Sequence, residues 1–216
     1  MIITKTNLLQ LPFENNLNDI LGATNQSGNN PSFVNGQFGR AVDFNGTSNY
    51  LEYPHDSKYD LGDEFCFSFW INPGTWSGSS SNRIIYGKRL WGQGADKAGI
   101  VIRGFNNVFN VNFFGTGFFS ITTSLPPTNQ WTHVVINCDR SGTLEIYYNL
   151  IEQLSTDMSS RSQHSINNTE NITIGRRPDI NAAFYAGILD SFNLWKTKLN
   201  FGDIKRVRHG LHPLNG

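Results

Sequence analysis

The sequence predicts an all-β sandwich with one short helix near the C-terminus, on the basis of three observations. The chain of 216 residues contains 21 Gly and 26 Asn, which favour turns over helices. Short runs rich in Phe, Ile, Val and Tyr recur between clusters of Gly, Asn and Ser, which is typical of strands joined by turns. Helical spacing is found only within residues 200–209, where Phe201, Ile204 and Val207 follow one another at three-residue steps.

Eleven runs in chain order have the composition of strands, and short strands at this spacing predict a sandwich or a barrel. The polar stretch 155–169 is predicted to be a loop between strands, and no change of composition marks a linker. We therefore expect a single domain over residues 1–216. The eleven runs are residues 41–44, 50–53, 65–72, 83–88, 99–103, 108–114, 118–122, 131–138, 144–148, 171–175 and 185–195.

The charge balance limits the classes of partner. Seventeen basic and seventeen acidic side chains cancel, so the chain lacks the positive charge that nucleic-acid binding needs, and we expect no nucleic-acid partner. No run reaches the roughly 20 apolar residues of a membrane-spanning helix. The first residues, MIITKTNLLQLPFENN, do not have the pattern of a Sec signal peptide.

Two cysteines, Cys66 and Cys138, are too few for a disulfide framework. We expect two core thiols, and a single bridge stays open as the alternative in an oxidising compartment.

Four segments in order carry a resemblance to a known family. Each combines a glycine turn or a tryptophan with a strand pattern, and together they extend over about residues 10–210. The segments are residues 36–51 (GQFGRAVDFNGTSNYL), 67–73 (FSFWINP), 131–149 (WTHVV followed by GTLEIYYN), and 174–204, with Ile174-Gly175, YAGILD, Trp195 and Asp203-Ile204.

These segments resemble the laminin-G-like jelly roll of the concanavalin A-like lectin/glucanase superfamily, which includes the pentraxins. The resemblance implies two antiparallel sheets packed face to face, with Trp70, Trp131 and Trp195 buried. Asn149-Leu150 stands where the family commonly has Asn-Gly, so we expect a longer or bulged hairpin there.

The sequence argues against catalysis. Glycan-cleaving enzymes need two carboxylates on one face, and no strand candidate carries acidic residues two or four positions apart. No nucleophile elbow, His-Glu-x-x-His motif or phosphate loop is present. His133 lies within the strand motif of the family and is interpreted as structural. We expect no enzymatic activity.

The resemblance implies one structural Ca²⁺. Asp19, the Gly46 carbonyl, Asn49 and Asp190 correspond to positions that come together as a calcium site in many relatives, and Ca²⁺ prefers such oxygen ligands. The alternative is that Asp19 caps a turn and Asp190 hydrogen-bonds the nearby backbone.

Two tryptophans outside the strand patterns, Trp76 and Trp91, are the candidates for stacking on a sugar ring, because an exposed Trp in a Gly/Ser loop usually has a partner. Burial in a subunit contact and packing back onto the domain are the alternatives. Polar side chains expected at the same end of the sandwich are Asp96, Arg103, Asn106, Asn107, Arg176, Arg177 and Asp179. Asp96 and Asp179 resemble pentraxin calcium ligands, but Arg176 and Arg177 beside them would repel a cation.

We therefore predict a non-catalytic binding module that recognises a glycan on a virion or cell surface, in an oligomer or particle with other protein subunits. We expect it to be extracellular or on a virion surface, without a Sec signal peptide. The alternative is a structural or decoration protein that docks other subunits and binds no sugar, and a lyase or hydrolase ranks third.

Overall fold

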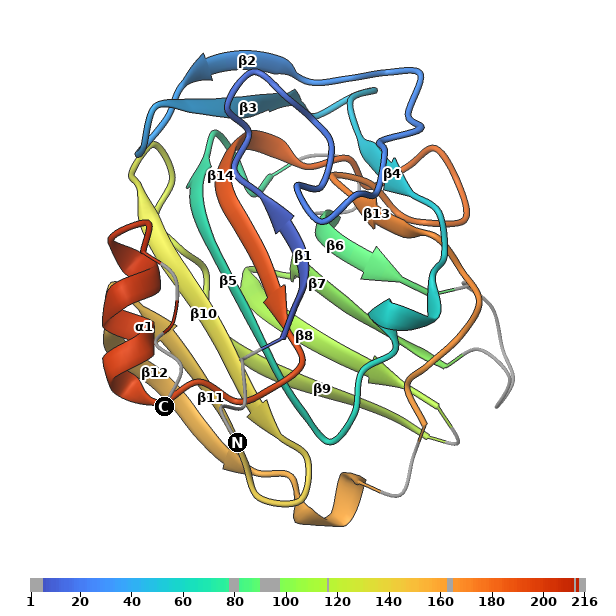
Figure 1. The fold of residues 1–216 in the computed structure, drawn as a ribbon, viewed down its shortest axis with the longest axis vertical. Coiled ribbons are helices and arrows are strands. Elements are labelled where there is room, and N and C mark those ends of the chain that lie inside the picture. Colours follow the sequence, from blue (N-terminus) through green and yellow to red (C-terminus); the bar gives the residue numbers. More distant parts are fainter. Residues whose placement is uncertain are drawn as a thin grey trace.

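The computed structural model describes residues 6–77, 82–89, 98–115, 117–162, 165–211 and 213. Two antiparallel sheets pack face to face, and one short helix, α1 (Phe201–Arg208), lies against one of them (Figure 1). No helix in these ranges is long and apolar enough to cross a membrane.

The larger sheet has eight strands and the smaller sheet has six. The eight-stranded sheet has the order β12-β11-β10-β5-β14-β3-β2, with β1 paired to β14, and the six-stranded sheet has the order β4-β13-β6-β7-β8-β9. The strands are β1 (Asn7–Leu11), β2 (Ser32–Asn35), β3 (Arg40–Asn45), β4 (Leu51–Tyr53), β5 (Glu64–Pro73), β6 (Asn82–Lys88), β7 (Gly99–Phe105), β8 (Val108–Phe114), β9 (Phe118–Ser124), β10 (Thr132–Asp139), β11 (Thr143–Tyr148), β12 (Ile151–Asp157), β13 (Ile172–Ile174) and β14 (Ala186–Trp195). Two 3₁₀ turns, η1 (Ser57–Tyr59) and η3 (Ser159–Arg161), complete the described elements.

The main core fills the space between the sheets and is rich in aromatic rings. Phe67 on β5 packs against Tyr86 on β6 with ring centroids 4.8 Å apart, and Phe69 stacks on Phe192 at 5.3 Å. All four side chains are fully buried. Their alternation along β5 explains the sequence FCFSFW, in which every second residue points into the sandwich.

A second, smaller core lies on the outer face of the eight-stranded sheet, beneath α1. Ile204 and Val207 of the helix pack on Trp195 and Val135, which leaves the helix with one buried face. The Asn200 side chain caps the helix by accepting a hydrogen bond from the Asp203 backbone N–H at 2.9 Å. The C-terminal helix predicted from the sequence is therefore present, and it covers one sheet.

Both cysteines are free and buried. Cys66 belongs to the core beneath α1, whereas Cys138 belongs to the core between the sheets. In the register of β5 and β10, Cys66 is opposite Asn137, and Cys138 is opposite Phe65. The two thiols therefore point to opposite faces of one sheet, so the expectation of two core thiols is confirmed and the bridge is not formed.

All eleven predicted runs contain a strand, but β1, β2 and β12 were not predicted. Residues 155–157 belong to β12, so the prediction of a loop from residue 155 onward was wrong at its start. β12 is mostly exposed and is the last strand of its sheet, so its residues IEQLSTD lack the apolar alternation that marks a half-buried strand.

The hairpin between β11 and β12 is not longer than usual. Asn149 and Leu150 both have positive φ, 51° and 72°, and Tyr148 pairs directly with Ile151 across this two-residue turn. The register shifts between Ile146 and Tyr147, so the expectation of a bulge is confirmed. The positive φ of Leu150 costs roughly 1–2 kcal/mol that a glycine would avoid.

The three strand tryptophans differ in burial. Trp195 and Trp70 are buried, but both lie on the outer side of the eight-stranded sheet, Trp195 beneath α1 and Trp70 beside it. Trp131 is only half-buried, so the prediction that it is a core residue was wrong.

Candidate functional site

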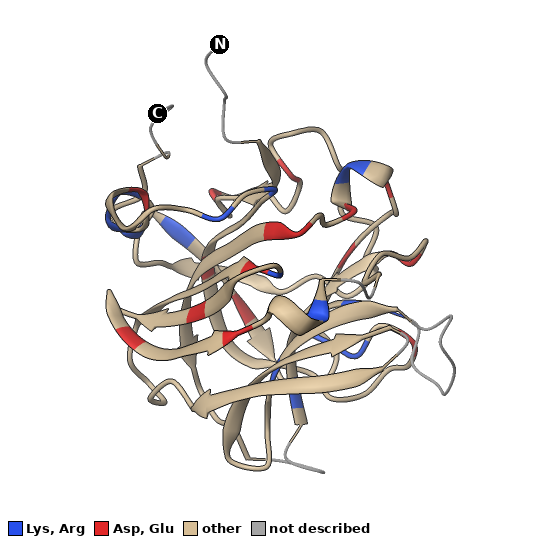
Figure 2. Ribbon diagram, turned by 90° about the horizontal axis from the view of Figure 1, so that it is seen from below, with Lys and Arg blue, Asp and Glu red and all other residues tan. Residues whose placement is uncertain are grey.

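The outer face of the six-stranded sheet carries polar side chains in its middle. Ile102, Phe109 and Val111 point into the core, so their neighbours Arg103 and Asn110 point outward. Strand pairing places Arg103 beside Asn110, and Asn110 beside Thr122 on β9. Charged residues lie on several strands of both sheets (Figure 2), and within β7, β8 and β9 Arg103 is the one charged residue.

The loop after β13 brings two more charged groups to this face. Pro178 lies over the backbone of β6 at Gly87, where a Cβ atom would come within 3.0 Å of the proline ring. Gly87 therefore allows the close approach of this loop. Arg177 and Asp179, on either side of the proline, form a bidentate ion pair with N–O distances of 2.8 and 3.2 Å.

Three guanidinium groups gather at this place. Arg89, directly after β6, and Arg103 on β7 are buried, and Arg177 is close enough to both to lower their pKa values. Burial lowers the pKa of Arg89 to about 10, with the positive charges of Arg177 and Arg103 acting in the same direction and Asp179 opposing them. Burial and Arg177 also lower the pKa of Arg103. We call Arg89, Arg103, Arg177 and Asp179 the arginine cluster.

Aromatic rings lie beside the arginine cluster. The Arg89 guanidinium is 3.4 Å from the centroid of the Phe114 ring, and the Arg103 guanidinium is 4.6 Å from that of Phe105. Phe118, the strand neighbour of Phe114, has an exposed fraction of 59 %. Cation–π contacts fix the planes of the guanidinium groups. The face thus combines oriented positive charge with exposed aromatic surface.

Amide and hydroxyl groups continue the polar face across β8 and β9. The Asn112 side-chain amide donates to the Ser120 hydroxyl at 2.7 Å, and this hydroxyl donates to the side-chain amide oxygen of Asn110 at 3.1 Å. The Asn112 side-chain oxygen is buried and has no hydrogen-bond partner among the described residues. Guanidinium, amide and hydroxyl groups in one place can recognise a ligand that carries both hydroxyl and carboxylate groups.

Arg176 lies on the same side of this sheet but at its β4 edge. Its guanidinium pairs with Glu52 at 2.9 Å, donates to Asn181 at 2.8 Å, and lies 3.8 Å from the centroid of the Tyr50 ring. The Glu52 carboxylate therefore balances the positive charge of Arg176.

Trp76 packs back onto the domain and does not stand free in its loop. Its indole N–H donates to the Pro126 carbonyl at 2.8 Å, and its ring lies over Gly104, where a Cβ atom would come within 2.3 Å of it. Tyr185 is a further ring neighbour at 6.1 Å. The structure thus favours packing on the domain over sugar stacking for Trp76, because the glycine leaves room for the ring. Trp91 and Asp96 lie outside the described residues.

The four residues predicted to bind calcium lie in separate hydrogen-bond networks. The Asp19 carboxylate accepts from the Gln10 and Leu21 N–H groups, and the Gly46 carbonyl accepts from Arg83 at 3.3 Å. The Asn49 side chain accepts from the Asn45 N–H and donates to the Asn30 carbonyl. The Asp190 carboxylate accepts from the Phe38 N–H and the Ser191 hydroxyl. Burial raises the pKa of Asp190. These contacts match the alternative of turn and backbone hydrogen bonds.

One of these four positions is already in contact with a positively charged side chain. The Arg83 guanidinium already lies against the Gly46 carbonyl, and its positive charge disfavours a second cation there. Within the described ranges, no three His, Cys, Asp or Glu side chains form a group that could hold a metal ion. Calcium stays a prediction from the resemblance.

The sequence analysis expected Arg103, Arg177 and Asp179 at one end of the sandwich, and the structure places Arg177 near Arg103 and in an ion pair with Asp179. The sequence analysis did not select Arg89 or the Asn110–Ser120–Asn112 hydrogen bonds. The place of Arg89 directly after a strand and the alternation of Asn with Phe within residues 108–114 were the available signals.

Two antiparallel sheets packed face to face form a jelly-roll β-sandwich. The chain belongs to the concanavalin A-like lectin/glucanases superfamily, whose family model matches residues 45–205. No curated protein matches the chain in sequence.

Solved structures with the same fold include toxin binding domains and one domain of an arabinanase. The chain is similar to the binding domain of Paraclostridial Mosquitocidal Protein 1, with a TM-score of 0.75 and 17 % identity over 93 % of this chain and 51 % of that one. It is also similar to the botulinum neurotoxin serotype D ligand-binding domain in complex with N-acetylneuraminic acid (TM-score 0.72, 15 % identity, 94 % and 50 % covered). The chain thus spans about half the length of these toxin domains.

A third similar structure is covered almost completely. It is domain 4 of AbnA, an extracellular arabinanase from Geobacillus stearothermophilus, in complex with arabinotriose, with a TM-score of 0.69 and 18 % identity over 92 % of this chain and 96 % of that one. At these identities the three structures establish the fold of this chain.

Proposed function

We propose that the chain is a non-catalytic carbohydrate-binding module that takes its ligand on the outer face of the six-stranded sheet. The observation that carries this proposal is the arginine cluster, in which three guanidinium groups lie close together with the carboxylate of Asp179, counted over the described residues. Grouping like charges costs free energy, and such groupings are common where a ligand of opposite charge binds. Membership of a lectin and glucanase superfamily supports a saccharide as that ligand.

The ligand class that best suits the cluster is an acidic saccharide. A guanidinium group binds a carboxylate through two parallel hydrogen bonds, a geometry that a lysine cannot offer. The Arg177–Asp179 pair holds one guanidinium in position, and Phe114 and Phe105 fix the planes of the other two. Sugar hydroxyls would meet the amide and hydroxyl groups of β8 and β9.

The proposal includes a surface setting. A shallow face with few contacts binds a single sugar weakly, and repetition of the domain on an oligomer, a particle or a cell surface raises the overall affinity. The solved relatives in complex with arabinotriose and N-acetylneuraminic acid support a sugar-binding role for this fold.

A glycan array that contains matched acidic and neutral glycans tests the proposal. The variant Arg103→Gln/Arg177→Gln removes two charges from the arginine cluster, and Lys196→Gln/Lys205→Gln removes two exposed charges elsewhere as the matched control. We expect the wild type and the control to bind carboxylated glycans, and the cluster variant to lose at least tenfold in affinity. An EDTA arm tests the predicted calcium.

Two results would overturn the proposal. One is unchanged glycan binding by the folded cluster variant. The other is a folded wild type that binds no glycan, which favours the role of a subunit-docking structural protein.

A further inference from the structure

The last residue of β6, Lys88, is a buried lysine outside the arginine cluster. Its exposed fraction is 4 %, and its side-chain nitrogen Nζ lies 3.6 Å from the Asp60 carboxylate and 3.4 Å from the side-chain oxygen of Asn168. Nζ also donates to the Asn168 backbone carbonyl. A lysine is rarely buried unless it is paired. These contacts bring an amine, an amide and a carboxylate to one place.

The Asn168 side-chain amide is held at both ends by the backbone. Its nitrogen Nδ2 donates to the backbone carbonyls of Lys88 at 2.9 Å and of Ala98 at 2.8 Å. Its oxygen Oδ1 accepts from the Glu170 N–H at 2.8 Å. A backbone N–H on a carbonyl oxygen stabilises the negative charge that develops there when a nucleophile attacks the carbonyl carbon. The amide is thus oriented with its oxygen on a hydrogen-bond donor.

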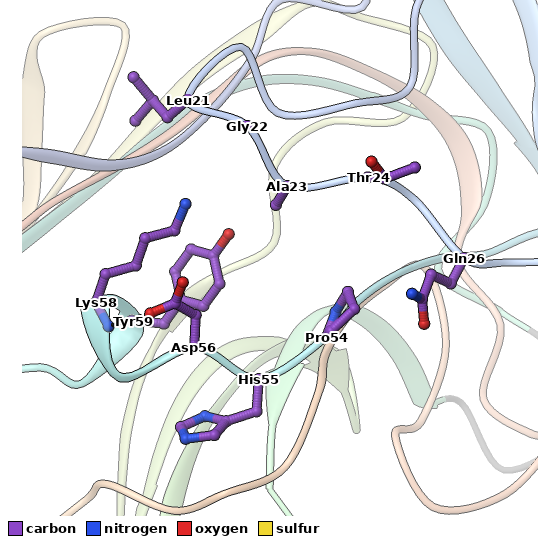
Figure 3. A pocket seen from close by; sticks show the side chains of 10 residues that line it. All are labelled: Leu21, Gly22, Ala23, Thr24, Gln26, Pro54, His55, Asp56, Lys58 and Tyr59. Atoms are coloured by element: carbon purple, nitrogen blue, oxygen red, sulfur yellow. Dashed lines mark hydrogen bonds between the residues drawn. The ribbon is translucent and has the colours of Figure 1, made fainter.

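The segment that carries Asp60 is joined to the loop that carries Asn168. The Leu61 N–H donates to the side chain of Asn167 at 2.8 Å. On the other side, Asp60 follows η1, which borders the cavity between the segment after β4 and the loop that precedes β2 (Figure 3). The Asp60 N–H donates to the Ser57 carbonyl at 3.1 Å. The carboxylate therefore keeps its place beside the lysine.

The surroundings of Lys88 favour the neutral amine. Burial lowers the pKa of Lys88, against the opposing charges of Asp60 and Glu170. A lysine amine acts as a nucleophile only after it has lost its proton, and burial is one way in which proteins produce the neutral form. The Asp60 carboxylate lies close enough to accept that proton. A nucleophile, a proton acceptor and a polarised amide therefore meet at this place.

We propose that Lys88 and Asn168 form an intramolecular isopeptide bond. Lys88 gives one proton to Asp60, and Nζ then bonds to the Asn168 carbon Cγ while the Glu170 N–H stabilises Oδ1. The Cγ–Nδ2 bond breaks, and Nδ2 leaves as ammonia after it receives a second proton from Nζ. The ammonia takes the proton from Asp60 and departs as ammonium. An amine and an amide thus give a new amide and ammonium, so the step needs no oxidant and no external reactant.

The bond joins the end of β6 to the loop before β13, 80 positions further along the chain. Closing a loop of this length restricts the unfolded chain more than the folded one, so the bond stabilises the domain. Lys88 also directly precedes Arg89, so the bond fixes the strand end that carries part of the arginine cluster. Formation of the bond does not depend on glycan binding, and its failure leaves the proposed function untouched.

Intact-mass spectrometry of the folded chain tests the proposal, because the bond lowers the mass by one ammonia molecule. Lys88→Arg removes the nucleophile but keeps the charge, and Asn168→Ala removes the amide. Lys198→Arg is the matched control, since Lys198 is also ion-paired, at 2.8 Å from Glu145, but contacts a carboxylate and a hydroxyl rather than an amide. Tryptic digestion and fragmentation locate the bond, and circular dichroism checks that each variant is folded.

We expect the wild type and Lys198→Arg to lack the mass of one ammonia and to yield a branched tryptic peptide that joins Lys88 to Asn168. Lys88→Arg and Asn168→Ala should have the full mass of their sequences. In freshly purified protein, Asp60→Asn should slow the loss of ammonia about a hundredfold, because it removes the proton acceptor.

Two outcomes would overturn the inference. One is a folded wild type that has the full mass of its sequence. The other is a loss of ammonia that persists in Lys88→Arg, which assigns the loss to a succinimide at an asparagine. The first outcome involves no variant, so it decides the question even where a substitution prevents folding.

Discussion

The two outer faces of this sandwich differ in what covers them. The eight-stranded sheet is covered by α1, which buries Ile204 and Val207 on Trp195 and makes a second apolar core. Over the residues that the structure describes, no helix covers the outer face of the six-stranded sheet, which carries the arginine cluster and the hydrogen bonds through Ser120.

The covered face therefore contributes to stability, and the polar face carries the proposed binding site. Apolar burial stabilises the covered face in proportion to the area removed from water. The polar face gains little from its grouped positive charges, because burial and mutual repulsion both oppose them. A substitution on the covered face should therefore lower the free energy of unfolding, and one on the polar face should lower ligand affinity.

The largest effect is expected from Ile204→Ala on the buried side of α1. Ile204 has an exposed fraction of 1 %, so its truncation leaves a cavity above Trp195 and should cost about 2–5 kcal/mol in the free energy of unfolding. Chemical denaturation measures this cost. Phe201→Ala on the same helix is the control, since Phe201 is 45 % exposed and should cost less than about 1 kcal/mol. Equal losses in both variants would contradict the view that α1 buries one face.

A smaller effect is expected from acid, through His133 on the covered face. Its ring is buried, hydrogen-bonded to the Ser68 hydroxyl at 2.8 Å and 5.2 Å from Trp70 between ring centroids. Burial, with the positive charges of Arg208 and His209, lowers the pKa of His133 to about 3. The folded protein therefore holds a neutral imidazole that the unfolded chain protonates below pH 6.5.

The contribution of His133 is thus complete above pH 6.5 and is lost as the pH falls from 6.5 toward 3. Between pH 6.5 and pH 5 the free energy of unfolding should fall by about 2 kcal/mol from this group. Denaturation at several pH values measures the slope, and His133→Gln should flatten it. An equal slope in wild type and variant would assign the acid sensitivity to other groups.

The smallest effect is expected from Trp76→Phe, which tests the packing of the loop tryptophan. Loss of the indole hydrogen bond to the Pro126 carbonyl should cost about 1 kcal/mol in the free energy of unfolding. Glycan affinity should not change, because the ring lies over Gly104 and against the core. A loss of glycan affinity without a loss of stability would restore the stacking role that the sequence predicted for Trp76.

The sequence predicted most of the strands whose side chains meet the core. It missed β1, whose three leucines are buried there, and two strands at the margins of a sheet. Phe67 and Phe69 alternate with polar or small residues, and this alternation is visible without a structure. β2 and β12 lie at the ends of the eight-stranded sheet and have exposed residues on both faces, so their sequences carry no such pattern.

The candidate site was predictable only in part. Arg103 lies on β7 and Asp179 lies in the loop after β13, 76 positions further along the chain, so the local sequence does not show that they belong to one cluster. The inward fold of Trp76 depends on the space left by Gly104, a contact between distant segments that no local pattern reports. The position of α1 on the eight-stranded sheet also depends on tertiary packing, although the spacing of its apolar residues predicted the helix itself.

The most direct test of the central claim is to map a bound acidic oligosaccharide onto the ¹⁵N-labelled chain by NMR chemical-shift perturbation. We expect the largest shifts on the outer face of the six-stranded sheet, at Arg103, Asn110, Asn112, Thr122 and Arg177. Largest shifts along α1 or on the strands beneath it, with this face unperturbed, would contradict it.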